Sequence, residues 1–68
     1  MPSQLTLKAA RVNAGYTQKQ VANVLSVDPI TIGRWEANPG NMDAKQLKTL
    51  CNMYNVSIDD IFLPIIQQ

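Results

Sequence analysis

The chain has 68 residues, of which 46% are hydrophobic and 16% are charged, and its formal net charge is +1. A chain of this length buries only about 60% of the surface that its unfolded form exposes, so it supports one domain rather than two. Its hydrophobic content is high enough for a packed core, which excludes the disordered class. Its apolar stretches are far shorter than the roughly 20 residues of a membrane span, and its start lacks a secretory-signal pattern, so we expect a cytoplasmic protein with no membrane partner.

Residue types that supply metal ligands and nucleophiles are scarce. Cys51 is the only cysteine and there is no histidine, so an internal disulfide is impossible and the usual zinc-ligand sets cannot be assembled. The five acidic residues form no paired arrangement suited to acid–base catalysis. We therefore expect no metal, no cofactor and no small-molecule ligand, and an enzyme is the function class that the sequence favours least.

The first helix is predicted near the start of the chain. Leu7, Ala10 and Ala14 recur at spacings of three and four residues, which favours a helix from about Gln4 to Asn13 with Gly15 as its C-cap.

A second helix is predicted after this glycine. Thr17 can act as its N-cap, and Gln20 three residues later completes a capping box. The helix is expected to be about nine residues long. Its apolar residues are Val21, Ala22, Val24 and Leu25.

A third helix is predicted after the short turn of residues 26–28. Asp28 followed by Pro29 is a helix-start signal, because a carboxylate caps the helix and proline is favoured at its first position. The helix is expected to run from about Pro29 to Ala37, with Ile32 and Trp35 on its core face. Residues 38–41 then favour a turn.

The last third of the chain predicts two further helices. Asp43 and Gln46 repeat the capping pattern, before an apolar stripe. Ser57 and Asp60 indicate one more start, and Pro64 discourages this fifth helix from continuing. The stripe of the fourth helix is Leu47, Leu50, Cys51 and Tyr54, and the fifth carries Ile58, Ile61 and Phe62. The sequence thus predicts an all-α domain of five short helices over residues 1–63, followed by a short apolar tail, 64–68.

Four ordered motifs together resemble the lambda/434 repressor and Cro superfamily of helix-turn-helix proteins, the XRE family, from about Leu5 to Leu63. The motifs are Leu7-x-x-Ala10-Arg11, Tyr16-Thr17-Gln18-x-x-Val21-Ala22, Val27-x-x-x-x-Ile32-x-x-Trp35-Glu36, and Leu47-x-x-Leu50-Cys51-x-x-Tyr54-x-Val56-Ser57-Ile58-Asp59-x-Ile61. The family often has a glycine where this chain has Ser26 and a small residue where it has Cys51. Serine can adopt most turn geometries, and a buried thiol behaves as a small hydrophobe. Neither difference therefore changes the expected fold.

This resemblance implies a transcriptional regulator that binds double-stranded operator DNA, with the second helix across the DNA backbone and the third in the major groove. The forked N–H donors of Arg34 suit O6 and N7 of guanine, so this residue is a candidate for base recognition. The alternative is that Arg34 is a solvated surface arginine without a role in binding. Ile30 could contact a thymine methyl or belong to the core, and we favour exposure because it lies about 200° round the helix from Ile32. By position, the candidate base contacts are Pro29, Ile30, Thr31 and Arg34.

The resemblance also implies phosphate contacts and one structural ion pair. Gln18 lies at the amino end of the second helix, where free N–H groups and the helix dipole favour an anion. For these residues a solvent-facing role is the alternative. The candidates are Thr17, Gln18, Lys19, Asn38, Asn41 and Lys45. Arg11 and Glu36 occupy positions where the family often has an ion pair, whereas Trp35 and Tyr54 are interpreted as core residues.

Two features concern partners. The apolar tail from Leu63 to Ile66 and the two-fold symmetry of operators together predict a homodimer, at least on DNA. The low net charge keeps a second hypothesis open, a protein-binding module such as an antitoxin or antirepressor. The charges before Asp28 are all positive, and Asp59 and Asp60 lie near the other end, so one end of the domain could still face phosphate.

Overall fold

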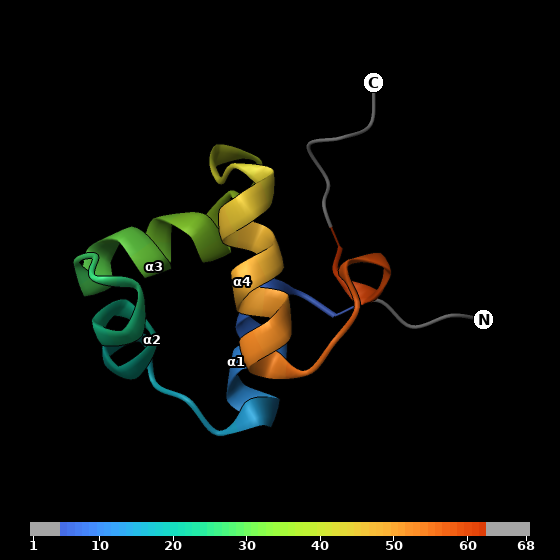
Figure 1. The fold of residues 1–68 in the computed structure, drawn as a ribbon, viewed down its shortest axis with the longest axis horizontal. Helices are drawn as coiled ribbons and strands as arrows, with labels where there is room; N and C mark the ends of the chain where they lie inside the picture. The colour runs from blue at the N-terminus through green and yellow to red at the C-terminus, as the bar shows by residue number, and fades with distance from the viewer. Residues whose placement is uncertain (1–4, 63–68) are drawn as a thin grey trace.

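The computed structural model describes residues 5–62, and in this part the chain is helical with no strand. Helices α2 and α3 pack together on one side of the central helix α4, and the two ends of the described chain lie on the other side (Figure 1). The α-helices are α1 (Leu7–Ala14), α2 (Gln18–Leu25), α3 (Pro29–Ala37) and α4 (Ala44–Tyr54), and the 3-10 turns are η1 (Pro39–Asn41) and η2 (Ile58–Asp60).

Side-chain caps fix the helix boundaries. The hydroxyl of Thr17 accepts a hydrogen bond from the amide of Gln20 at 3.0 Å, and the Gln20 side chain accepts from the amide of Thr17 at 2.9 Å, so the predicted capping box is present. Asp43 and Gln46 form the same reciprocal pair at α4. Asp28 caps α3, which starts at Pro29 as predicted. These caps supply partners to backbone amides that the first turn leaves unpaired.

Two boundary predictions are wrong. Helix α1 begins at Leu7, capped by Thr6, rather than near Gln4, because Leu5 pairs in extended conformation with Ile61. The same pairing limits the fifth helix to the single 3-10 turn η2, although the capping box of Ser57 is present. The amide of Phe62 donates to the carbonyl of Leu5 at 2.8 Å, which holds the chain extended after η2. Of the apolar residues predicted for that helix, only Ile61 is buried.

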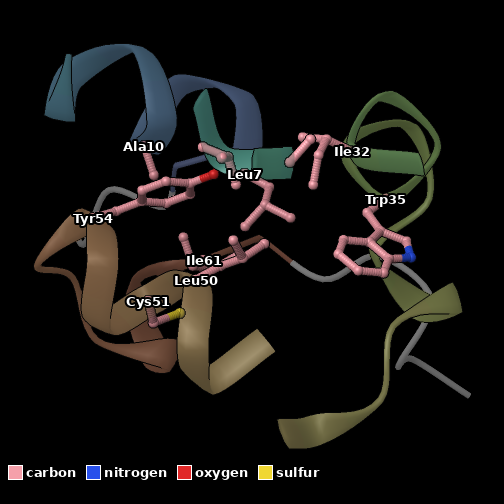
Figure 2. Packing of buried hydrophobic residues seen from close by; sticks show 10 residues of the cluster. Leu7, Ala10, Ile32, Trp35, Leu50, Cys51, Tyr54 and Ile61 are labelled. Carbon is pink, nitrogen blue, oxygen red and sulfur yellow. The ribbon is translucent and has the colours of Figure 1, made fainter. Parts of the chain in front are cut away.

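The core lies between α4 and the other three helices. Tyr54 stands at one end of the cluster and Trp35 at the other, with leucine and isoleucine side chains between them (Figure 2). Both aromatic rings are buried, which confirms that they are core residues. The buried hydrophobic residues are Leu7, Ala10, Val21, Ala22, Ile32, Trp35, Leu50, Cys51, Tyr54 and Ile61.

Two polar groups of α4 lie in this apolar core. The hydroxyl of Tyr54 is buried without a hydrogen-bond partner among the described residues. Burial, and then the charge of Glu36, raise the pKa of Tyr54 to about 12. Burial and the nearby Asp60 raise the pKa of the Cys51 thiol. The thiol therefore remains protonated and packs as a small apolar group.

A buried ion pair joins α1 to α3. Arg11 Nε donates to Glu36 Oε2 at 2.6 Å, and the two side chains are 9% and 6% exposed. Arg11 Nη1 also donates to the carbonyl of Tyr16 at 2.8 Å, and Gln18 Nε2 donates to Glu36 Oε1 at 3.0 Å. The pair that the family resemblance implied is thus present, and its charges and hydrogen-bonding groups are satisfied from three segments of the chain.

The turn between α2 and α3 contains an unfavourable backbone conformation. Ser26 is the C-cap of α2 and has φ 58° and ψ 43°, in the left-handed region. Its amide donates to the carbonyl of Asn23, and the amide of Val27 donates to the carbonyl of Ala22. The left-handed conformation costs a residue with a side chain roughly 1–2 kcal/mol, whereas glycine adopts it without this cost. This conformation gives a backbone reason for the glycine that the family resemblance implies at this position.

Arg11→Ala is expected to destabilise the domain by about 3–5 kcal/mol, because it leaves the Glu36 carboxylate buried without its counter-ion. The measurement is the free energy of unfolding in urea. Arg34→Ala is the matched control, since it removes the same charge from an exposed position. An Arg11 variant with unchanged stability would contradict a structural role for the pair.

Ser26→Gly is expected to raise the free energy of unfolding by up to about 1 kcal/mol, because glycine relieves the left-handed strain but loses more entropy on folding. Thermal unfolding monitored by circular dichroism measures the change. Ser57→Gly serves as the control, since Ser57 has φ −85° and its hydroxyl accepts from the amide of Asp59. The control should gain nothing, and equal effects at both sites would argue against strain at Ser26.

Tyr54 predicts a loss of stability in alkali. Its pKa of about 12 in the folded state exceeds the value near 10 of an unfolded chain, so only the unfolded state ionises as the pH rises from 10 to 12. The free energy of unfolding should therefore fall by about 2 kcal/mol more in the wild type than in Tyr54→Phe between pH 9 and 11.5. Parallel curves for the two proteins would show that Tyr54 ionises freely in the folded state.

Candidate nucleic-acid interface

Helix α3 has an inner and an outer face. Ile32 is fully buried and Trp35 nearly so, whereas Ile30 is 68% exposed and Arg34 is also exposed. Ile30 and Arg34 are four residues apart and therefore lie on the same side of the helix. This confirms the favoured interpretation that Ile30 lies outside the core. Thr31 is half-buried at the margin of the same face.

The amino end of α2 has the features of an anion site. Thr17 Oγ1 accepts from the amide of Gln20, and the carbonyl of Thr17 accepts from the amide of Val21. The two preceding amides, those of Gln18 and Lys19, lie in the first turn, where a helix offers no acceptor of its own. The positive end of the helix dipole lies at these two amides, and the ammonium group of the exposed Lys19 adds a full positive charge.

The side chain of Gln18 contacts α3. It runs beside Gly33, where an added Cβ would lie 3.6 Å from Gln18 Nε2, and ends on the Glu36 carboxylate. The predicted phosphate contact of Gln18 can thus come from its backbone amide, while its side chain joins α2 to α3. Sequence reasoning missed this hydrogen bond, since no periodicity connects residues 18 apart on two helices.

An open hollow of about 440 Å³ connects the start of α2 with the start of α3. Pro29, at the first position of α3, lines it together with the turn residue Val27. Gln20 and Asn23 also line the hollow, although the sequence analysis did not select them as site residues. The complete lining is Thr17, Lys19, Gln20, Ala22, Asn23, Val27 and Pro29. It contains one cation and no carboxylate.

The remaining phosphate candidates form a second group, on the connection between α3 and α4. Asn38 is the C-cap of α3, and its carbonyl accepts from the amide of Asn41 at 3.0 Å across the turn η1. Lys45 is the second residue of α4. All three side chains are exposed, and none lines the hollow at the start of α2. The structure thus brings Lys19 together with Pro29 but leaves Lys45 on a separate part of the surface.

No described helix is long and apolar enough to cross a membrane. A family model described as helix-turn-helix matches residues 7–61 of the chain. The HTH-type transcriptional regulator ImmR of Bacillus subtilis (strain 168) is 42% identical over 53 residues, which make up 78% of this chain and 42% of that protein. The chain therefore spans less than half the length of this relative. No solved structure matches the chain.

The family match begins at the first residue of α1 and ends just after η2, so it includes all four α-helices and the buried residues between them. It confirms the resemblance seen in the sequence motifs. The chain belongs to the Cro/C1-type (XRE) helix-turn-helix family, a family of transcriptional regulators and not of enzymes.

Proposed function

We propose that this protein is a sequence-specific DNA-binding regulator that acts in the cytoplasm, with α2 and α3 as its helix-turn-helix. In this arrangement α3 enters the major groove of operator DNA and α2 lies across the phosphate backbone. The main support is the outer face of α3, where the exposed Ile30 and Arg34 stand one turn apart on a helix whose inner face is buried.

The side chains of α3 differ in what they can recognise. Arg34 offers two parallel N–H groups, which match O6 and N7 of guanine. Ile30 has no hydrogen-bonding group, and its exposed branched side chain fits a thymine methyl. Thr31 contributes a hydroxyl to a base edge or a phosphate. Pro29 serves mainly to start the helix, because its position at N1 fits the fixed φ of proline.

Phosphate contacts hold the domain in register. The amides of Gln18 and Lys19 bind one phosphate at the start of α2, with the ammonium group of Lys19 beside them. Thr17 contributes as the residue that caps this turn and orients its amides. Asn38, Asn41 and Lys45 contact the backbone further along, from the connection between α3 and α4.

A homodimer on DNA completes this proposal, since a two-fold operator presents half-sites about one helical turn apart. The apolar tail, Leu63 to Ile66, was predicted to support dimer formation, and it lies outside the described residues. Sedimentation of the protein with and without a two-site duplex measures assembly directly. Truncation after Leu63 should weaken both dimer formation and operator binding, and unchanged values would show that the tail has no part in either.

The net charge of +1 favours a second candidate, a protein-binding module of the antitoxin or antirepressor kind. Selection of bound duplexes from a random pool, followed by mobility shifts at two salt concentrations, separates the candidates. A regulator enriches one sequence and retains its preference at the higher salt. A protein-binding module enriches none, and its weak binding to any duplex disappears as salt rises.

Arg34→Ala is expected to cost about 1–3 kcal/mol of binding free energy on the selected operator and to abolish the preference at one base pair per half-site. Lys19→Ala is the matched control, because it removes one cation from a residue that contacts phosphate alone. It should weaken all sequences equally and reduce the slope of log affinity against log salt by about one unit. Equal losses on every operator variant for Arg34→Ala would make Arg34 a backbone contact instead.

A further inference from the structure

The only side-chain hydrogen bond between α2 and α3 among the described residues is the one from Gln18 to Glu36. It joins the first residue of α2 to the last turn of α3, and the Nε2–Oε1 distance is 3.0 Å. The acceptor is almost completely buried, with 6% of the Glu36 side chain exposed. A hydrogen bond to a buried charged acceptor is stronger and more restrictive than one at the surface.

The acceptor carboxylate is itself fixed. Arg11 holds both of its oxygens, with Nε at 2.6 Å from Oε2 and Nη2 at 3.4 Å from Oε1, and the same guanidinium donates to the carbonyl of Tyr16. Glu36 therefore has little freedom to follow a movement of α2. The Gln18 side chain instead ties α2 to a carboxylate that Arg11 of α1 already holds, and this arginine is itself bound to the α1–α2 connection through the carbonyl of Tyr16.

Gly33 borders the path of the Gln18 side chain. A Cβ added at position 33 would lie 3.6 Å from Gln18 Nε2 and 3.9 Å from Gln18 Oε1, which are ordinary van der Waals distances. The side-chain amide of Gln18 therefore runs in close contact with the backbone of α3, one residue before Arg34.

We propose that Gln18 is a positioning residue for base readout: its side chain sets the position of α3 relative to the phosphate-binding amides at the start of α2, without touching a base. This inference rests on the proposed function. If α2 is held on a phosphate, the depth and angle at which α3 enters the groove depend on the rigidity of the α2–α3 unit. Bidentate recognition by Arg34 is sensitive to that angle, whereas phosphate contacts tolerate a small rotation.

The test compares Gln18→Met with wild type on the selected operator and on a duplex changed at the base pair that Arg34 reads. Methionine keeps the length and packing of the side chain beside Gly33 but cannot donate to Glu36. A good bidentate contact discriminates against the wrong base by roughly 5- to 150-fold. We expect Gln18→Met to reduce this discrimination by about three- to tenfold, mainly through weaker binding to the correct operator.

Two controls separate positioning from mere stabilisation. Gln46→Met removes a capping hydrogen bond of α4, from the amide of Asp43 to Gln46 Oε1, and should leave discrimination unchanged. In an Arg34→Ala background, Gln18→Met should cost no more on the operator than on the changed duplex, because the contact that it positions is gone. All affinities are measured at a temperature where circular dichroism shows each variant fully folded.

The outcomes are distinct. If wild-type protein selects no sequence, the proposed function fails and this inference fails with it. If wild type discriminates and Gln18→Met discriminates equally well, the inference alone fails. A Gln18→Met variant that loses the same factor on both duplexes, in both backgrounds, would likewise overturn it, and would show that the side chain acts on a phosphate or on folding only.

Discussion

The carboxylate of Glu36 is the constraint on which the arrangement of α1, α2 and α3 depends. A buried carboxylate is costly unless a counter-ion and hydrogen-bond donors surround it. Arg11 supplies the charge from α1, and Gln18 supplies an amide from α2. Because Arg11 neutralises the charge and Gln18 adds a further donor to the same carboxylate, three helices that also pack in the core are tied to one buried group. The hydrogen bonds of this polar cluster require particular positions of the three helices, whereas the apolar contacts of the core are less directional.

Helix α3 serves the core and the candidate DNA surface at the same time. Ile32 and Trp35 insert into the apolar cluster, which fixes the rotation of the helix about its axis (Figure 2). That rotation in turn determines that Ile30 and Arg34 face solvent. The core therefore orients the outer face before any ligand is present, which lowers the ordering cost of binding.

The charge distribution suggests how a nearly neutral domain can bind a polyanion. Full positive charges at the candidate surface are few, with Lys19 near the start of α2 and Arg34 on α3. Backbone amides at a helix start attract a phosphate through their dipoles and add no net charge to the protein. An interface built in this way releases fewer counter-ions than a strongly basic one. It must rely more on fit and base contacts, which makes the relative placement of α2 and α3 important.

The sequence by itself determined the local features. Caps such as Thr17 and Asp28 act over two or three residues, and apolar spacing places Ile32 inside and Ile30 outside, so the central helices and the family could be predicted. The end of the fifth helix could not, because the capping box of Ser57 was correct but the pairing of Leu5 with Ile61 holds the chain extended after a single turn. The side chain of Gln18 was likewise decided by the tertiary structure. Its sequence position indicated a phosphate contact, but only the packing of α2 on α3 brings it within 3.0 Å of Glu36, where a buried charge competes for its amide more strongly than solvent does.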